Sequence, residues 1–296
     1  MTKTRNFLIV SILALAISLP TGLAMAQDTA DAAVRRIYEG VEEGRLEVAW
    51  QALPPSYQSD IRNILQNLAP ETEIELEVWN QSMGAMTKLL RVVRDKSNYI
   101  LGHPMLASQV GDESKRDEAQ GFLSGAADLL EIIFKSALTD PKKLASLDVE
   151  AYLAQVGPRL YKIFREIEAK SSPKEPQGKT IISLVSSQGD SARLSLQEPG
   201  KPAEEEDFVR VEGKWLPKEL VDGWDAQMEQ VESTLQMAAL QAQDEEKIAQ
   251  QRMMLGMLDQ SLDQMAAANS QEEFNTAAQA LIGAVFMAAA SQPQGQ

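Results

Sequence analysis

The sequence predicts an α+β protein that is predominantly α. Two observations lead to this fold class: apolar residues recur at helical spacing over most of the chain, and one short stretch instead alternates apolar and polar residues around tight turns. We expect a helical N-terminal region, a small antiparallel β-meander of three to four strands, and C-terminal amphipathic helices. The expected segments are a signal peptide at 1–26, a helical domain at 27–170, a linker at 171–178, the meander at 179–222, C-terminal helices at 223–290 and a disordered tail at 291–296.

The first 26 residues have the organisation of a secretory signal peptide. Lys3 and Arg5 precede an apolar run at 7–19, which is shorter than the roughly 20 residues that a membrane-spanning helix needs. Ala24-Met25-Ala26 places small side chains where signal peptidase accepts them, so we expect cleavage before Gln27. The protein is therefore expected to be periplasmic or secreted.

The composition favours a soluble protein whose fold is not stabilised by disulfide bonds. The chain has no Cys, so neither a lipid-modified cysteine nor a disulfide is expected. Loss of Lys3 and Arg5 with the leader changes the formal net charge from −15 to −17. Such a charge argues against nucleic acid and anionic lipid as partners. No later stretch is long and apolar enough to suggest an integral membrane protein.

Proline, glycine and capping residues divide the helical region. Pro54-Pro55 ends one helix and begins the next, and Asp148 caps a long helix near the end of the region. We expect a kink or a break in that last helix at Gly157-Pro158.

The meander is predicted from a change of hydrophobic period. Gln188-Gly189-Asp190 and Glu212-Gly213 are turn sequences, and a linker rich in proline and polar residues precedes the first strand. The expected strands lie at 179–186, 192–196, 208–211 and 214–216. So small a sheet needs a helix over one face to be stable, and the C-terminal helices are expected to cover it or to extend beside it.

Methionine is concentrated in the C-terminal helices. Met253, Met254 and Met257 could offer thioether sulfurs to Cu(I), but Met254 is about 100° around the helix from Met253. Core packing, or a groove for a partner helix, is the more common use of methionine. We therefore name Met253 and Met257 as possible ligand or partner contacts, and self-association through these helices as possible.

No catalytic, cofactor-binding or metal-binding residue can be assigned from the sequence. His103 precedes Pro104 in an expected loop and has no cysteine or fixed acidic neighbour to complete a zinc site. The acidic run at 204–207 is typical of a solvated face or loop. Trp215 and Trp224 could stack a ligand between sheet and helix, although ordinary sheet-on-helix packing predicts the same spacing.

Three stretches resemble a family of exported bacterial proteins of unknown function: AWQALPPSYQ at 49–58, KSNYIL at 96–101 and FVRVEGKWLPKELVDGW at 208–224. The GDSARLSL and FVRVEGKW segments are also similar to the β-meander of NTF2-like domains. The first resemblance implies export. The second implies a ligand-binding cone between helix and sheet, without a clear counterpart of the acidic or histidine residues that its enzymatic members use.

The function favoured by elimination is a non-enzymatic binding or interaction role in the bacterial envelope, with a protein or a small molecule as partner. Two alternatives remain open. One is an exported hydrolase with an unrecognised site, and the other is a chaperone-like groove formed by the Met- and Ala-rich C-terminal helices. Whether the protein is an enzyme is uncertain, and the sequence leans against it.

Overall fold

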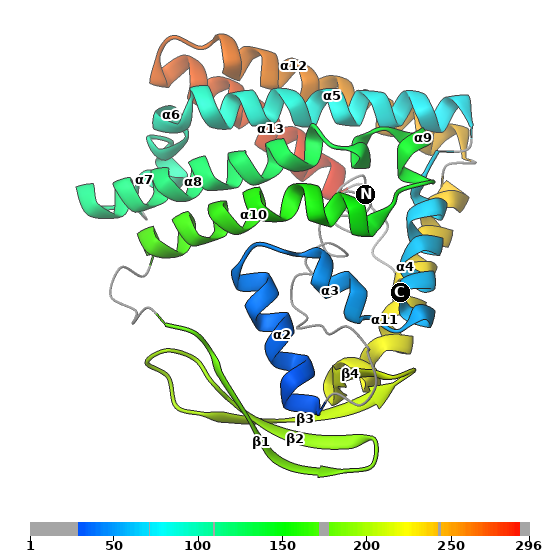
Figure 1. Cartoon of the computed structure of the whole chain (residues 1–296). Coiled ribbons are helices and arrows are strands. Elements are labelled where there is room, and N and C mark those ends of the chain that lie inside the picture. The colour runs from blue at the N-terminus through cyan, green and yellow to red at the C-terminus, as the bar shows by residue number, and fades with distance from the viewer. Residues whose placement is uncertain (1–28, 71, 109, 172–177, 242–243, 291–296) are drawn as a thin grey trace. The chain divides into compact units, whose positions relative to one another are not determined.

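The structure is a computed structural model that describes residues 29–70, 72–108, 110–171, 178–241 and 244–290. The predicted signal peptide and C-terminal tail lie outside these residues, as does most of the predicted linker. The fold class is confirmed: the protein is α+β and predominantly α, with one antiparallel sheet of four strands (Figure 1).

The described elements follow the predicted order closely. The first group of helices is α2 (Ala30–Glu42), α3 (Glu47–Ala52), α4 (Pro55–Leu68), α5 (Glu73–Asp95), α6 (Ser97–Leu101), α7 (Pro104–Ala107), α8 (Glu113–Phe134), η1 (Ala137–Thr139), α9 (Pro141–Leu144) and α10 (Val149–Ser171). The strands are β1 (Ile181–Gln188), β2 (Ser191–Gln197), β3 (Glu204–Val211) and β4 (Lys214–Pro217). The last helices are α11 (Lys218–Gln241), α12 (Glu245–Ala267) and α13 (Gln271–Ala290).

The chain forms two compact units, each assembled from segments that are far apart in the sequence. The first unit comprises the described residues of Met1–Ala69, Lys142–Arg165 and Ser172–Met237. The second comprises those of Pro70–Pro141, Glu166–Ser171 and Ala238–Gln296. The helices predicted at 27–170 are therefore shared between the two units.

The first unit is built on the sheet, whose strands follow the chain order β1-β2-β3-β4. Helix α2 lies across one face of the sheet (Figure 1). Small residues on α2 let the helix approach the strands closely, and the face beneath it is apolar. The buried residues of this core are Ala30, Ala33, Val34, Ile182, Ala192, Leu194, Phe208 and Trp215.

Two tight turns set the register of the sheet. Gly189 has φ +61 and, with Asp190, joins β1 to β2 in a two-residue loop. Glu212 and Gly213 both have positive φ, 48 and 82, as a type I′ turn between β3 and β4 requires. Both turns lie where the sequence predicts them.

Strand β3 begins at Glu204, four residues before the predicted start at 208. The acidic run at 204–207 is therefore part of a strand. Arg193 on β2 explains how the strand tolerates it, because its guanidinium pairs with Asp207 (Nε to Oδ1, 2.7 Å) and reaches Glu205 at 4.0 Å. Opposite charges across a strand pair stabilise a sheet.

Helices α4 and α11 meet through an aromatic stack in the same unit. The rings of Tyr57 and Trp224 lie 3.9 Å apart and almost parallel. Trp224 is 1% exposed, and its indole Nε1 donates a hydrogen bond to Asp60 (2.9 Å). The stack anchors the helix that follows the sheet onto the N-terminal part of the chain.

Helix α10 continues across Pro158, so the break considered at Gly157-Pro158 does not occur. A proline inside a helix removes one backbone hydrogen bond, but here the preceding glycine makes a close contact. A Cβ on Gly157 would lie 2.4 Å from the carbonyl oxygen of Gly44. Gly44 has φ +77 and lies in the turn that follows α2. The missing side chain is therefore what lets α10 pack against this turn.

The second unit is helical. Helix α12 packs against α5 and α13, and α8 also packs against α5. Its core contains Ala85, Val92, Leu262, Met265, Ala268, Phe274, Ala277 and Ala278. Lys88 of α5 bonds both Asp259 (2.8 Å) and Asp263 (2.6 Å) of α12. The two C-terminal helices thus pair with each other, and α12 also pairs with α5.

None of the helices among the described residues combines the length and the apolar character that crossing a membrane requires.

The contact at Gly157 can be tested with a matched pair of glycine substitutions. Gly157→Ala should destabilise the protein by about 1–3 kcal/mol, because the new Cβ meets backbone. Gly84→Ala, on α5, should stabilise it by about 0.5–1 kcal/mol, because nothing lies within 4 Å of its Cβ position and alanine favours helix. Denaturant unfolding measures both. Equal effects of the two substitutions would contradict the close approach of α10.

Candidate functional site

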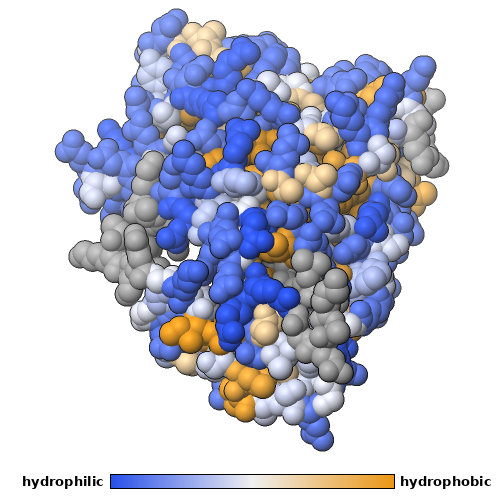
Figure 2. Space-filling view, viewed as in Figure 1, coloured by the Kyte–Doolittle hydropathy of each residue, from blue (hydrophilic) through white to orange (hydrophobic). Residues whose placement is uncertain are grey.

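The first strand of the sheet presents apolar side chains to solvent. The strand order places β1 at one edge of the sheet. Ile181, Leu184 and Val185 are 59%, 42% and 48% exposed. Figure 2 shows orange, apolar surface at the lower end of the view, where Figure 1 places the sheet. We call residues 181–188 the β1 edge.

The turn geometry shows which backbone groups of the β1 edge point outward. A two-residue turn closes with a hydrogen bond between Gln188 and Ser191, and hydrogen-bonded pairs alternate along an antiparallel ladder. A bulge at Val185 sets Val185 and Ser186 opposite Arg193. Counting back from the turn, the backbone N–H and C=O groups that face away from β2 belong to Ile182, Leu184 and Ser187.

One contact from α2 agrees with this count. The guanidinium of Arg35 donates a hydrogen bond to the carbonyl oxygen of Ile182 at 3.0 Å and also bonds Asp31 at 3.2 Å. A side chain that reaches this carbonyl from α2 requires the carbonyl to point away from β2. Arg35 therefore covers one end of the β1 edge, while the outward groups of Leu184 and Ser187 lie further along it.

The β1 edge carries no charged residue from 181 to 188, although the chain is strongly acidic. Natural edge strands usually carry lysine, proline or other charges that prevent pairing with a further strand. On β1, the features that oppose such pairing are the bulge and the Arg35 guanidinium. An uncharged, exposed and partly apolar edge has the properties of a surface that accepts an added strand.

The two tryptophans named from the sequence are buried. Trp215 is 7% exposed within the core between α2 and the sheet, and the guanidinium of Arg210 lies 5.4 Å from its ring centre. Trp224 stacks on Tyr57, in a different part of the unit. Both rings serve packing in this structure, and a ligand contact at either stays a prediction.

The two methionines named from the sequence lie on α12. Met253 is 60% exposed and Met257 is partly buried. Within the part of the chain that the structure describes, no group of three or more His, Asp or Glu side chains is placed to hold a metal ion. His103 caps the short helix α7, where its Nδ1 accepts a hydrogen bond from the backbone N–H of Met105 at 3.4 Å.

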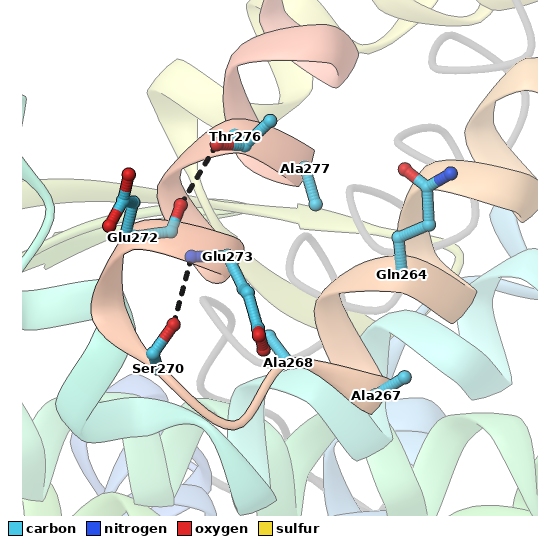
Figure 3. Close-up of a pocket in the computed structure, with 8 residues that line it drawn as sticks. All are labelled: Gln264, Ala267, Ala268, Ser270, Glu272, Glu273, Thr276 and Ala277. Atoms are coloured by element: carbon cyan, nitrogen blue, oxygen red, sulfur yellow. Dashed lines mark hydrogen bonds between the residues drawn. The ribbon is translucent and has the colours of Figure 1, made fainter.

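A hollow of about 530 Å³ lies at the turn between α12 and α13 (Figure 3). Gln264 and Ala267 of α12 line it from one side, and Ala277 of α13 from the other. The carboxylates of Glu272 and Glu273 diverge in this view rather than converge. The hydroxyl of Ser270 accepts a hydrogen bond from the Glu273 N–H (3.2 Å), so it caps the N-terminus of α13. This open hollow does not assemble an acid–base pair.

A carboxylate that sequence reasoning missed lies at the margin of the core under α2. Glu206 faces α2 because it pairs across the strands with the buried Leu194. Burial raises the pKa of Glu206, and the charge of Glu219 adds to the effect. Burial also raises the pKa of Tyr38 to about 12, with contributions from Glu206 and Glu198. In the sequence Glu206 was one acid of a run of four, so nothing distinguished it.

Comparison with family models, with curated proteins and with solved structures finds no match to the chain.

Replacing Glu206 should reveal the cost of burying its charge. The folded-state pKa is above the ordinary value of 4.5, so the ionised carboxylate destabilises the fold at neutral pH, and the effect fades as the pH falls through the raised pKa toward 4.5. Glu206→Gln should therefore raise the unfolding free energy at pH 7 and leave it almost unchanged at pH 4.

The control is Glu205→Gln, on the exposed face of the same strand, where it lies near Arg193. Removing that charge should give no stabilisation at pH 7. Urea unfolding at both pH values measures the two variants, and a Glu206→Gln variant no more stable than the parent at pH 7 would show that the carboxylate is well solvated.

Proposed function

We propose that this protein is an exported, non-enzymatic interaction protein of the bacterial envelope, and that it binds its partner by adding an extended segment to the β1 edge. One observation carries the proposal: the exposed apolar residues Ile181, Leu184 and Val185 share an uncharged strand at the edge of the sheet. In this mode of recognition, backbone hydrogen bonds supply affinity and alternate side chains supply specificity.

The two faces of the sheet explain why the edge, rather than a face, is proposed as the site. Helix α2 buries one face in the core. The opposite face carries the ion pair between Arg193 and Asp207, whose charges satisfy each other. Among the described strands, we therefore propose the outward row of backbone groups on β1, with apolar side chains beside it, as the surface for a partner.

Export is supported by the sequence of the first 26 residues, and the resemblance to exported bacterial proteins agrees with it. An extracytoplasmic location also suits a chain without cysteine, because its folding does not depend on the redox state of the compartment.

A second candidate rests on Met253. Its 60% exposure on α12 favours the chaperone-like alternative, in which the C-terminal helices offer an adaptable methionine surface to a partner. Helix α12 is already packed against α5 and α13, so the surface left for a partner on this helix is the side that carries Met253. The same side would serve the self-association through C-terminal helices considered from the sequence.

The export proposal predicts a mature protein that begins at Gln27. Mass spectrometry of the protein from the periplasm or medium should show the loss of residues 1–26. Ala24→Phe should block processing, because signal peptidase requires a small residue there. Met25→Phe, at the permissive position between the two alanines, is the matched control and should be processed normally. Unprocessed wild-type protein in the cytoplasm would refute export.

The binding proposal predicts site-specific crosslinks in cells. A photo-crosslinking amino acid at position 185 should capture a partner, and the same residue at the exposed position 205 should not. In the chain that carries the crosslinker at position 185, Leu184→Lys should abolish capture, because a charge on the β1 edge opposes an added strand.

A third chain with the crosslinker at position 253 tests the alternative surface. Capture from 185 that Leu184→Lys removes supports the β1 edge. Capture from 253 alone would assign binding to α12, and capture from neither position would contradict both.

A further inference from the structure

The proposed function leaves open which extended segment the β1 edge accepts. Resting on that function, we propose that the segment is β1 of a second copy of this chain, which runs antiparallel to the first and joins two four-stranded sheets into one across a two-fold axis. Three features of β1 support this occupant: the faces of its residues, the direction of its backbone groups and the charges at its two ends.

The bulge gives β1 a self-complementary order of faces. A two-fold axis perpendicular to the sheet keeps every residue on its own face, so residues that pair must share a face. Before the bulge, Ile182 faces α2, and after it Ser187 does, since Ser187 pairs with the buried Ala192. A regular strand would put residues 182 and 187 on opposite faces, because five positions separate them.

In one register all the face assignments agree. It pairs Ile182 with Ser187 of the second copy, and the axis passes beside the two bulges. The same register pairs Ser183 with Ser186, and Ile181 with Gln188, on the opposite face. Because Val185 and Ser186 together oppose one residue, Leu184, which shares the α2 face with Ile182, lies opposite Leu184 of the other copy at the axis, so exposed apolar side chains of the two edges meet.

The backbone groups match in the same register. Ile182 and Ser187 are both residues whose N–H and C=O groups point away from β2, so they can exchange two hydrogen bonds as an antiparallel pair. The two-fold axis repeats this pair on the other side of the bulges. The N–H of Ser187 would then take the place of Arg35 at the Ile182 carbonyl, and Arg35 keeps its bond to Asp31.

The charges at the ends of the β1 edge are complementary. When the same register is extended by two residues beyond each end of β1, Lys179 of one copy lies beside Asp190 of the other. The two-fold axis repeats this pair, so it occurs at both ends of the dimer interface. The Asp190 side chain is 69% exposed and pairs with Arg210 through one carboxylate oxygen, Oδ1, which leaves the other oxygen accessible to a further cation. Between these ends the edge has no charge, so two copies with a net charge of −17 can approach there without opposing like charges.

The first experiment measures the mass of the mature chain by sedimentation velocity over a concentration series, with circular dichroism as a check of folding. We expect a reversible dimer. Ser187→Pro should shift the protein to monomer, because it removes an outward N–H on both copies while leaving the backbone hydrogen bonds to β2 in place. It also removes the bond from the Ser187 hydroxyl to the Ser191 carbonyl oxygen (3.5 Å), which the alanine control removes as well. Ser187→Ala keeps this N–H and should dimerise as the parent does.

The second experiment uses two single charge variants, Lys179→Asp and Asp190→Lys. Alone, each places like charges at both ends of the dimer and should weaken dimerisation by about tenfold. Mixed in equal amounts, they form a heterodimer in which both end pairs are again of opposite charge, and its affinity should return to that of the parent. No contact elsewhere on the surface predicts this recovery.

A wild-type chain that stays monomeric at all concentrations would overturn the self-pairing. A dimer that Ser187→Pro leaves intact would do the same and move the interface to another surface, such as the C-terminal helices. These results are distinguishable from failure of the proposed function, because crosslinks from position 185 to a different protein would uphold binding at the β1 edge while excluding the second copy as its occupant.

Discussion

The packing of α2 on the sheet is the interaction on which the first unit depends. Four short antiparallel strands are stable when one of their faces is covered, and α2 supplies this cover with two alanines and a valine against Leu194, Phe208 and Trp215. Fully burying a side chain such as Phe208 contributes about 1.5–3 kcal/mol. Because one face is buried, a slip of one residue would turn every core side chain outward, so this contact also fixes the register.

The properties of the β1 edge follow from that register. With the strands in chain order, the first strand of the meander is left at a margin, where α2 contacts it through the buried Ile182 and through the Arg35 guanidinium. Glu205 and Asp207 on the face of β3 away from α2 are matched by Arg193 on the neighbouring strand. The charges on that face are thus paired within the sheet, whereas the uncharged strand β1 is left with outward backbone groups. The candidate site is a consequence of how the core is closed rather than a separate pocket.

Local patterns in the sequence predicted most of the elements but few of the contacts between them. Helical spacing located the helices, and Glu212-Gly213 located a turn whose backbone conformation few other sequences adopt. The start of β3 at Glu204 was missed because it depends on Arg193 across the sheet. The identity of the covering helix and the raised pKa of Glu206 were also missed. Each depends on residues distant in the chain, which a local period does not report.

If the chain is exported as we propose, the interleaved segments of its two units bear on how it reaches its folded state. Arg35 bonds a residue 147 positions later, and Lys88 bonds one 171 positions later. A polypeptide that crosses a membrane amino end first would present its early helices long before the strands or helices that cover them. Neither hydrophobic core could form until the late segments had crossed the membrane. The chain would therefore stay unfolded during translocation and complete its folding on the far side.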